Sequence, residues 1–83
     1  MRGQAEAAIK NLDAALKEAH ASLTDVVKTT IYVASSNRDD LLVAWQIISR
    51  AFGDHDAPST LVGVALLGYA DQLVEIEAIA AIP

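Results

Sequence analysis

The chain contains no cysteine, so it has neither a disulfide framework nor a thiolate metal site. Only six Lys and Arg stand against eleven Asp and Glu, which gives a formal net charge of −5. Nucleic-acid binding needs clustered positive charge, and these six residues are scattered, so we expect no nucleic-acid partner. No apolar run approaches the roughly 18 residues of a membrane span, and we expect no membrane partner either. An amphipathic segment, and not an apolar signal core, follows Met1, so we expect a cytoplasmic location.

Aliphatic residues are what the sequence has in plenty. Hydrophobic residues make up 53% of the 83 residues and charged residues 20%, a composition that excludes an intrinsically disordered protein. The length allows one domain at most, which we expect to cover residues 1–83. A chain this short buries only about 60–65% of its unfolded surface. We therefore expect a partner to bury much of the rest.

The spacing of apolar residues predicts five elements in the order α-β-α-β-β. Repeats at i, i+3, i+4 and i+7 predict helices over residues 4–19 and 38–52. β-branched runs predict strands over residues 26–34, 59–67 and 72–80. The first two strands should be parallel, joined by a helical crossover, and the last two should form an antiparallel hairpin. Two helices on one face would leave the other sheet face bare and apolar, which is typical of an interface.

Individual residues refine this picture. Asn37, with Asp40 three positions later, predicts a capping box at the start of the second helix. Gly53 stands where a left-handed residue ends that helix. Gly63 has no side chain, which suggests that another part of the molecule closely approaches the strand that contains it. Trp45 is assigned to the core. No capping residue precedes the first helix, so its start looks like that of a helix cut from a longer chain.

Three segments together resemble one family. They are residues 23–33 (LTDVVKTTIYV), residues 52–55 (FGDH) followed by 58–64 (PSTLVGV), and residues 74–80 (VEIEAIA). In this order they resemble the Rid/YjgF family, also known as the L-PSP endoribonuclease family. The match covers nearly the whole chain, and the last motif is quite specific.

The resemblance implies an α+β fold of the chorismate-mutase type. It also implies a homotrimer with a ligand cleft between subunits, a small-molecule metabolite as the ligand, and hydrolysis of reactive imines or enamines as the activity, with no cofactor and no metal. Members carry further strands before the first helix, which are not found here. We therefore expect a chain shortened at its N-terminus relative to the family, and leave open whether the cause is a shortened gene product, a mis-assigned start or a fragment.

Glu75 is the candidate catalytic residue. The resemblance implies that the first Glu of VEIEAIA orients the attacking water. Its neighbours Leu73, Val74 and Ile76 also suggest partial desolvation, which favours the protonated form of a carboxylate and suits general acid–base work. Glu77 is interpreted as a structural carboxylate or an interface partner.

Ser59, Thr60 and Leu61 are the candidate substrate-binding residues. By the resemblance, Ser59 stands where active members carry the arginine that holds a substrate carboxylate through paired hydrogen bonds. A serine offers one neutral donor, so an imino acid should bind poorly. His55, between two aspartates, is interpreted as part of a polar loop and not as a metal ligand. Three hypotheses remain: a deaminase with Glu75, a non-catalytic trimeric binder of small metabolites, and a fragment that does not fold alone.

Overall fold

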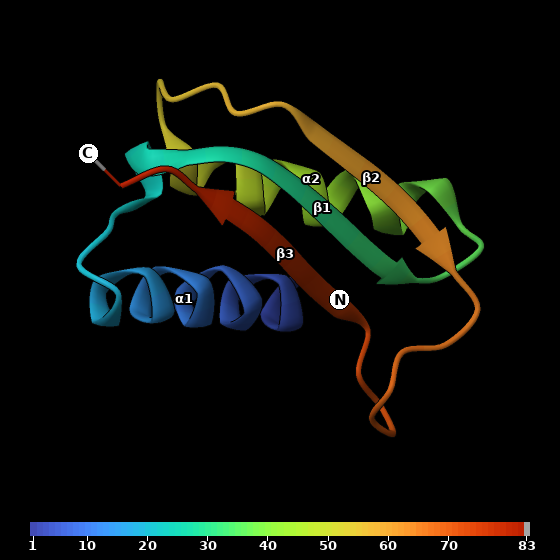
Figure 1. The fold of residues 1–83 in the computed structure, drawn as a ribbon. Helices are drawn as coiled ribbons and strands as arrows, with labels where there is room; N and C mark the ends of the chain where they lie inside the picture. Colours follow the sequence, from blue (N-terminus) through green and yellow to red (C-terminus); the bar gives the residue numbers. More distant parts are fainter. Residues whose placement is uncertain (83) are drawn as a thin grey trace.

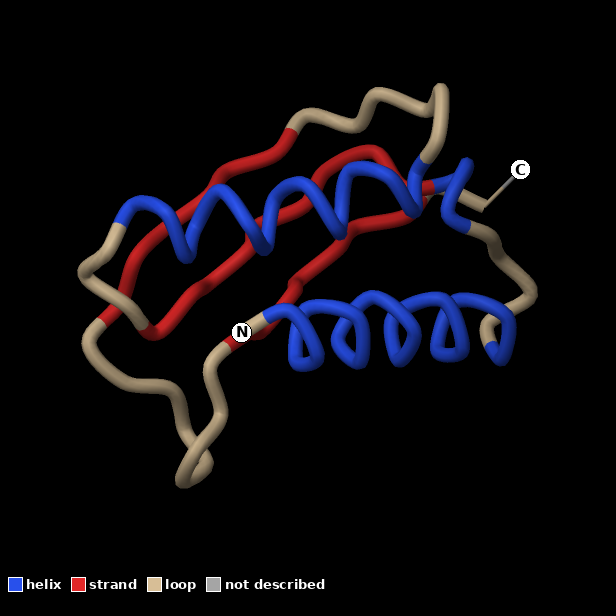
Figure 2. Tube along the Cα trace, turned by 180° about the vertical axis from the view of Figure 1, so that it is seen from behind, coloured by secondary structure: helices blue, strands red, loops and turns tan. Residues whose placement is uncertain are grey.

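The computed structural model describes residues 1–82, arranged as two helices against one sheet. Both helices lie on the same face of the sheet, and the other face is open (Figures 1 and 2). This confirms the expected α+β class. The elements in chain order are α1 (Arg2–Glu18), the short 3-10 helix η1 (Leu23–Asp25), β1 (Val26–Ala34), α2 (Arg38–Phe52), β2 (Ser59–Val64) and β3 (Val74–Ala80).

The sheet has three strands in the order β2-β1-β3. β1 pairs with β2 in parallel, as expected, but β3 pairs antiparallel with β1 and not with β2. The predicted hairpin is therefore wrong. β1 becomes the central strand, and its backbone N–H and C=O groups find partners on both sides. Residues 65–73 carry the chain across to the far edge of β1, so β2 ends and β3 begins inside the ranges that the sequence predicted.

A β-bulge near the start of β1 changes which residues share a face. Val26 pairs with Ala80 and Lys28 with Ile79, so Val27 is the extra residue between them. As a result Val26 is buried, while Val27 is 48% exposed. The alternation of faces along a regular strand is broken at these two positions, because a bulge shifts the pleat by one residue.

The main core lies between the helices and the covered face of the sheet. Its central side chains are Ile31 and Val33 from β1 and Ile48 from α2, all of them exposed by 1% or less. Ala5 and Ile9 from α1 complete the contact. The periodicity of the sequence correctly predicted that Ala5, Ile9 and Leu16 of α1 and Ala44 and Ile48 of α2 are buried. None of the helices in the described residues has the length and hydropathy that crossing a bilayer requires.

The start of α2 is capped by a short relay of side chains. The Asn37 side chain accepts a hydrogen bond from the Asp39 N–H at 2.9 Å, as an N-cap should. Asp40 does not close the expected capping box. Its carboxylate accepts instead from the Ser35 hydroxyl at 2.8 Å, and that hydroxyl accepts from the Asn37 N–H at 3.0 Å. Ser35 thus stands between the two groups that would meet directly in a capping box.

Two glycines meet the requirements that the sequence suggested. Gly53 follows α2 with φ of +61°, a conformation that L side chains rarely adopt. A Cβ at Gly63 would lie 2.9 Å from the Ser35 carbonyl oxygen, which is closer than a carbon and a backbone oxygen normally come. Gly63 therefore allows the end of β1 and its following loop to pack against β2.

Replacing Gly63 by alanine should therefore destabilise the fold. We expect Gly63→Ala to lower the free energy of unfolding by about 1–3 kcal/mol, because backbone must move to admit the methyl group. Gly68→Ala is the matched control, since nothing lies within 4 Å of its added Cβ, and it should change stability by no more than about 0.5 kcal/mol. Urea denaturation measures both, and equal effects of the two substitutions would contradict the close approach at Gly63.

Candidate functional site

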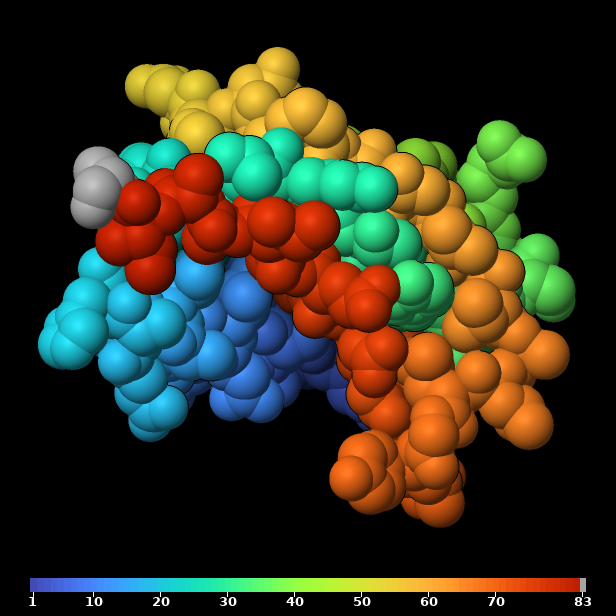
Figure 3. Space-filling view, viewed as in Figure 1, coloured from blue at the N-terminus to red at the C-terminus, as the bar shows by residue number. Residues whose placement is uncertain are grey.

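The open face of the sheet carries both polar and apolar side chains. The space-filling view shows the three strands side by side on this face (Figure 3). The expectation of a wholly apolar face is wrong, because hydroxyl and carboxylate groups occupy its centre. The residues that the strand register places on it are Lys28, Thr30, Tyr32, Ala34, Thr60, Val62, Val64, Glu75, Glu77 and Ile79.

Tyr32 and Glu77 form a cross-strand pair on this face. The Tyr32 hydroxyl donates to the Glu77 carboxylate over 2.6 Å. This hydrogen bond raises the pKa of Tyr32 above its ordinary value of about 10, and loss of solvent and the negative charges of Glu77 and Glu75 act in the same direction. The interpretation of Glu77 as a structural carboxylate therefore matches its contact.

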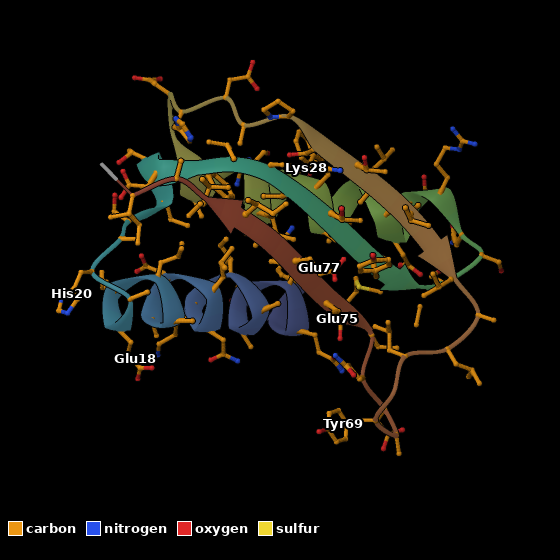
Figure 4. All side chains as sticks on the ribbon, in the orientation of Figure 1. Glu18, His20, Lys28, Tyr69, Glu75 and Glu77 are labelled. Atoms are coloured by element: carbon orange, nitrogen blue, oxygen red, sulfur yellow. The ribbon has the colours of Figure 1, made fainter. Side chains whose placement is uncertain are left out.

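Glu75 lies directly opposite Tyr32 in the antiparallel register, on the same face as Glu77 (Figure 4). Its side chain is exposed, and among residues 1–82 it makes no hydrogen bond or ion pair. The expectation that its own chain neighbours desolvate it is wrong. Val74 and Ile76 point to the covered face, because successive residues of a strand alternate.

The three candidate substrate-binding residues do not share one face. Ser59 pairs with the buried Thr29, whose hydroxyl donates to the Ser59 hydroxyl at 2.5 Å, and Ser59 in turn donates to the Ala57 carbonyl at 3.0 Å. Leu61 lies on the same helix-covered side, whereas Thr60 lies on the open face with Glu75. Ser59 and Glu75 of one chain are therefore on opposite faces of the sheet, and their functional roles stay predictions.

A pocket of about 180 Å³ lies where the C-terminal end of α2 meets the loop to β2. Trp45 lines it and is 37% exposed, so its assignment to the core is wrong. The cause is its position on α2, one residue beyond the buried Ala44, on the margin of the packed stripe. The other lining residues are Ile48, Ser49, Phe52, Gly53, His55, Asp56, Ala57 and Ser59.

His55 has a structural contact. Its Nε2 lies 2.7 Å from the Val26 carbonyl oxygen, which only accepts, so Nε2 carries the hydrogen. This contact ties the loop after α2 to the start of β1. It agrees with the interpretation of His55 as part of a polar loop, and no group of side chains suited to a metal ion occurs in residues 1–82.

Sequence reasoning missed three residues that organise these surfaces. Tyr32 engages Glu77, Thr29 engages Ser59, and the Gln4 side chain accepts from the Leu73 N–H at 2.6 Å. Each contact joins residues at least 30 positions apart in the sequence. Only the strand register could have revealed the first two, and the sequence alone predicted the wrong partner for β3.

Comparisons of the sequence and of the structure with known proteins point to the same family. The family described as endoribonuclease L-PSP matches residues 1–82. A RutC family protein of Pyrococcus abyssi is 39% identical over 80 residues, which cover 96% of this chain and 61% of that protein.

Solved structures agree with this match. A member of the YjgF/YER057c/UK114 family from Mycobacterium tuberculosis superposes with a TM-score of 0.84 at 35% identity, covering 94% of this chain and 64% of its own. RidA from an Antarctic Psychrobacter superposes with a TM-score of 0.85 at 29% identity, covering 99% of this chain and 64% of its own. The chain thus spans about three fifths of the length of these relatives.

The contact between Tyr32 and Glu77 should be visible in a titration. Because the folded-state pKa of Tyr32 is raised, the hydrogen bond contributes to stability below about pH 10 and loses that contribution as the pH rises through the folded-state value. In a Tyr69→Phe background Tyr32 is the sole tyrosine. We expect its phenolate absorbance to appear above pH 10, and Glu77→Gln to lower the midpoint.

Glu75→Gln is the matched control, because Glu75 acts on Tyr32 through charge alone. It should lower the midpoint less than Glu77→Gln does. Far-ultraviolet circular dichroism must report a folded chain across the titration. If Glu77→Gln leaves the titration midpoint of Tyr32 unchanged, the contact between Tyr32 and Glu77 is contradicted.

Proposed function

The chain belongs to the endoribonuclease L-PSP family, which includes YjgF and RidA proteins, and from this premise we propose that it hydrolyses reactive imines or enamines as an assembly of identical copies. The observation that supports this most is the state of the two carboxylates on β3. Glu77 accepts a hydrogen bond from Tyr32, whereas Glu75 makes no hydrogen bond or ion pair within the described chain. Glu75 is therefore the carboxylate available to a ligand.

The proposed reaction is addition of water to a carbon–nitrogen double bond. Glu75 accepts a hydrogen bond from the water, takes its proton as the oxygen bonds to the imine carbon, and passes the proton to the nitrogen. The resulting carbinolamine then loses its hydroxyl proton to the nitrogen as the carbon–nitrogen bond breaks, which gives a carbonyl compound and ammonia. No electrons are gained or lost overall, so the reaction needs no redox partner.

The proposed assembly follows from the open face and the placement of Ser59. A single chain holds Glu75 and Ser59 on opposite faces of the sheet, so a cleft that contains both requires a neighbouring copy. A homotrimer with the open faces turned inward would also cover Val62 and Ile79. Covering Glu75 would supply the desolvation that the chain alone does not give it.

Ser59 restricts the substrate. Its hydroxyl already donates to Ala57 and accepts from Thr29, and it has no charge with which to hold a carboxylate. We therefore propose an imine or enamine without a carboxylate next to the reacting carbon as the substrate. RNA cleavage fits the chain poorly, since a net charge of −5 repels the phosphate backbone.

The same feature of Ser59 favours a second candidate function, which is binding of a small neutral metabolite without turnover. Glu75 would then act as a hydrogen-bond acceptor for the ligand. The two candidates differ in one measurable respect, since only the first releases ammonia through Glu75.

Ammonia release tests the assignment of Glu75. A neutral imine is generated freshly by an amine oxidase from an aliphatic amine, and the protein should accelerate ammonia release above the rate in buffer. Glu75→Gln should lower the acceleration by about 10²–10⁴-fold, because a general base is lost. Glu77→Gln, which removes the neighbouring carboxylate on the same strand face, should retain most of it. If the wild-type protein and Glu75→Gln both release ammonia only at the rate in buffer, hydrolysis is contradicted and the binding function is favoured.

A second substitution tests the position of Ser59. The comparison substrate is 2-iminobutyrate, generated freshly by an amino-acid oxidase, which carries a carboxylate. Ser59→Arg should raise the rate with 2-iminobutyrate at least about tenfold relative to the neutral imine, because a guanidinium holds a carboxylate through paired charged hydrogen bonds. Asn11→Arg, at an exposed position of α1, serves as the control for added charge. An equal gain in both variants would mean that added positive charge, and not position 59, is responsible.

A further inference from the structure

The lining of the pocket at the end of α2 contains one acidic residue and no Lys or Arg. Trp45, Ile48 and Phe52 supply apolar walls, and the acidic residue is Asp56. Asp56 is exposed, and in the part of the chain that the structure describes it forms no ion pair or hydrogen bond. The pocket therefore offers an uncompensated negative charge beside an aromatic surface.

Except for the Trp45 indole N–H, the side-chain donors of the lining are already used by the chain itself. Ser59 donates to the Ala57 carbonyl, Ser49 lies 3.4 Å from the Gln46 carbonyl, and the His55 Nε2–H faces the Val26 carbonyl. An anion entering the pocket would find few free donors and would lie near a carboxylate. A cation would find the opposite conditions, because carboxylates and aromatic faces both attract positive charge.

The pocket is formed by the fold and not by a mobile tail. Gly53 turns the chain sharply at the end of α2 with φ of +61°, and His55 then ties the following loop to β1. The rings of Phe52 and His55 lie 6.3 Å apart between their centroids. Its volume of about 180 Å³ is similar to the roughly 150 Å³ cavity that holds benzene in an engineered protein. A ligand the size of one aromatic ring therefore fits.

We propose that this pocket binds small organic ammonium ions, with an apolar group against Trp45 and the positive charge beside Asp56. The inference deepens the proposed function, on which it rests in one respect: Ser59, in the pocket wall, marks the position where an arginine would hold a carboxylate. Serine at this position removes a positive charge, and Asp56 adds a negative one. The pocket thus selects amines and protonated imines over acids.

Trp45 provides a direct readout, because it is the only tryptophan in the chain and it lines the pocket. The probes are benzylamine, benzyl alcohol and benzoate at pH 7, which share one ring and carry a positive, a neutral and a negative group. Titration into the wild-type protein should change Trp45 fluorescence most strongly with benzylamine. Benzylamine should bind at least about threefold more tightly than benzyl alcohol, and benzoate most weakly.

Asp56→Asn should abolish the preference for benzylamine over benzyl alcohol. Asp54→Asn is the matched control, because it removes the same charge two residues away from a side chain outside the pocket lining. It should leave the preference unchanged. None of the probes is an imine, so the result does not depend on ammonia release, and a failure here is distinguishable from a failure of the proposed hydrolysis.

Three results would overturn the proposal. The first is binding of benzoate as tight as that of benzylamine. The second is an equal loss of preference in Asp54→Asn and Asp56→Asn, which would reveal only the general negative charge of the chain. The third is the absence of any saturable fluorescence change with benzylamine.

Discussion

The antiparallel pairing of β1 with β3 determines the rest of the molecule. It makes β1 the central strand and sets the register in which Tyr32 lies opposite Glu75 and donates to Glu77. Both helices pack against the same face of the three strands. One carboxylate of the VEIEAIA motif is therefore held by a phenol and the other is free, although both belong to the same strand and the same face.

This pairing also separates two surfaces with different chemistry. The open face carries Glu75 together with hydroxyl groups, and the pocket at the end of α2 carries Asp56 beside Trp45. The pocket lining contains no Lys or Arg, and the open face carries one cation, the exposed Lys28. The proposed preference for neutral or cationic ligands is consistent with a net charge of −5 and with the serine at the position of the family arginine.

The local features of the fold followed from the sequence, and the long-range ones did not. The bounds of β1 and the end of α2 were predicted correctly, because β-branched runs and Gly53 act within a few residues. The partner of β3 and the bulge at Val27 depend on which edge of β1 remains unpaired, and periodicity carries no information on that. Trp45 was misassigned for a related reason. A residue at the edge of the apolar stripe of a helix is buried only if another element packs against it. For the candidate site, the family motif identified Glu75, but the contact that distinguishes it from Glu77 required coordinates.

A crystal structure of the assembled protein tests the central claim most directly. The account predicts that the Glu75 carboxylate faces a cavity shared by adjoining copies and has no protein cation bound to it, while the Tyr32 hydroxyl keeps its contact with Glu77. An assembly that leaves Glu75 on a water-covered surface with no adjoining copy, or that pairs it with a lysine or arginine, would contradict the functional account and leave the fold unchanged.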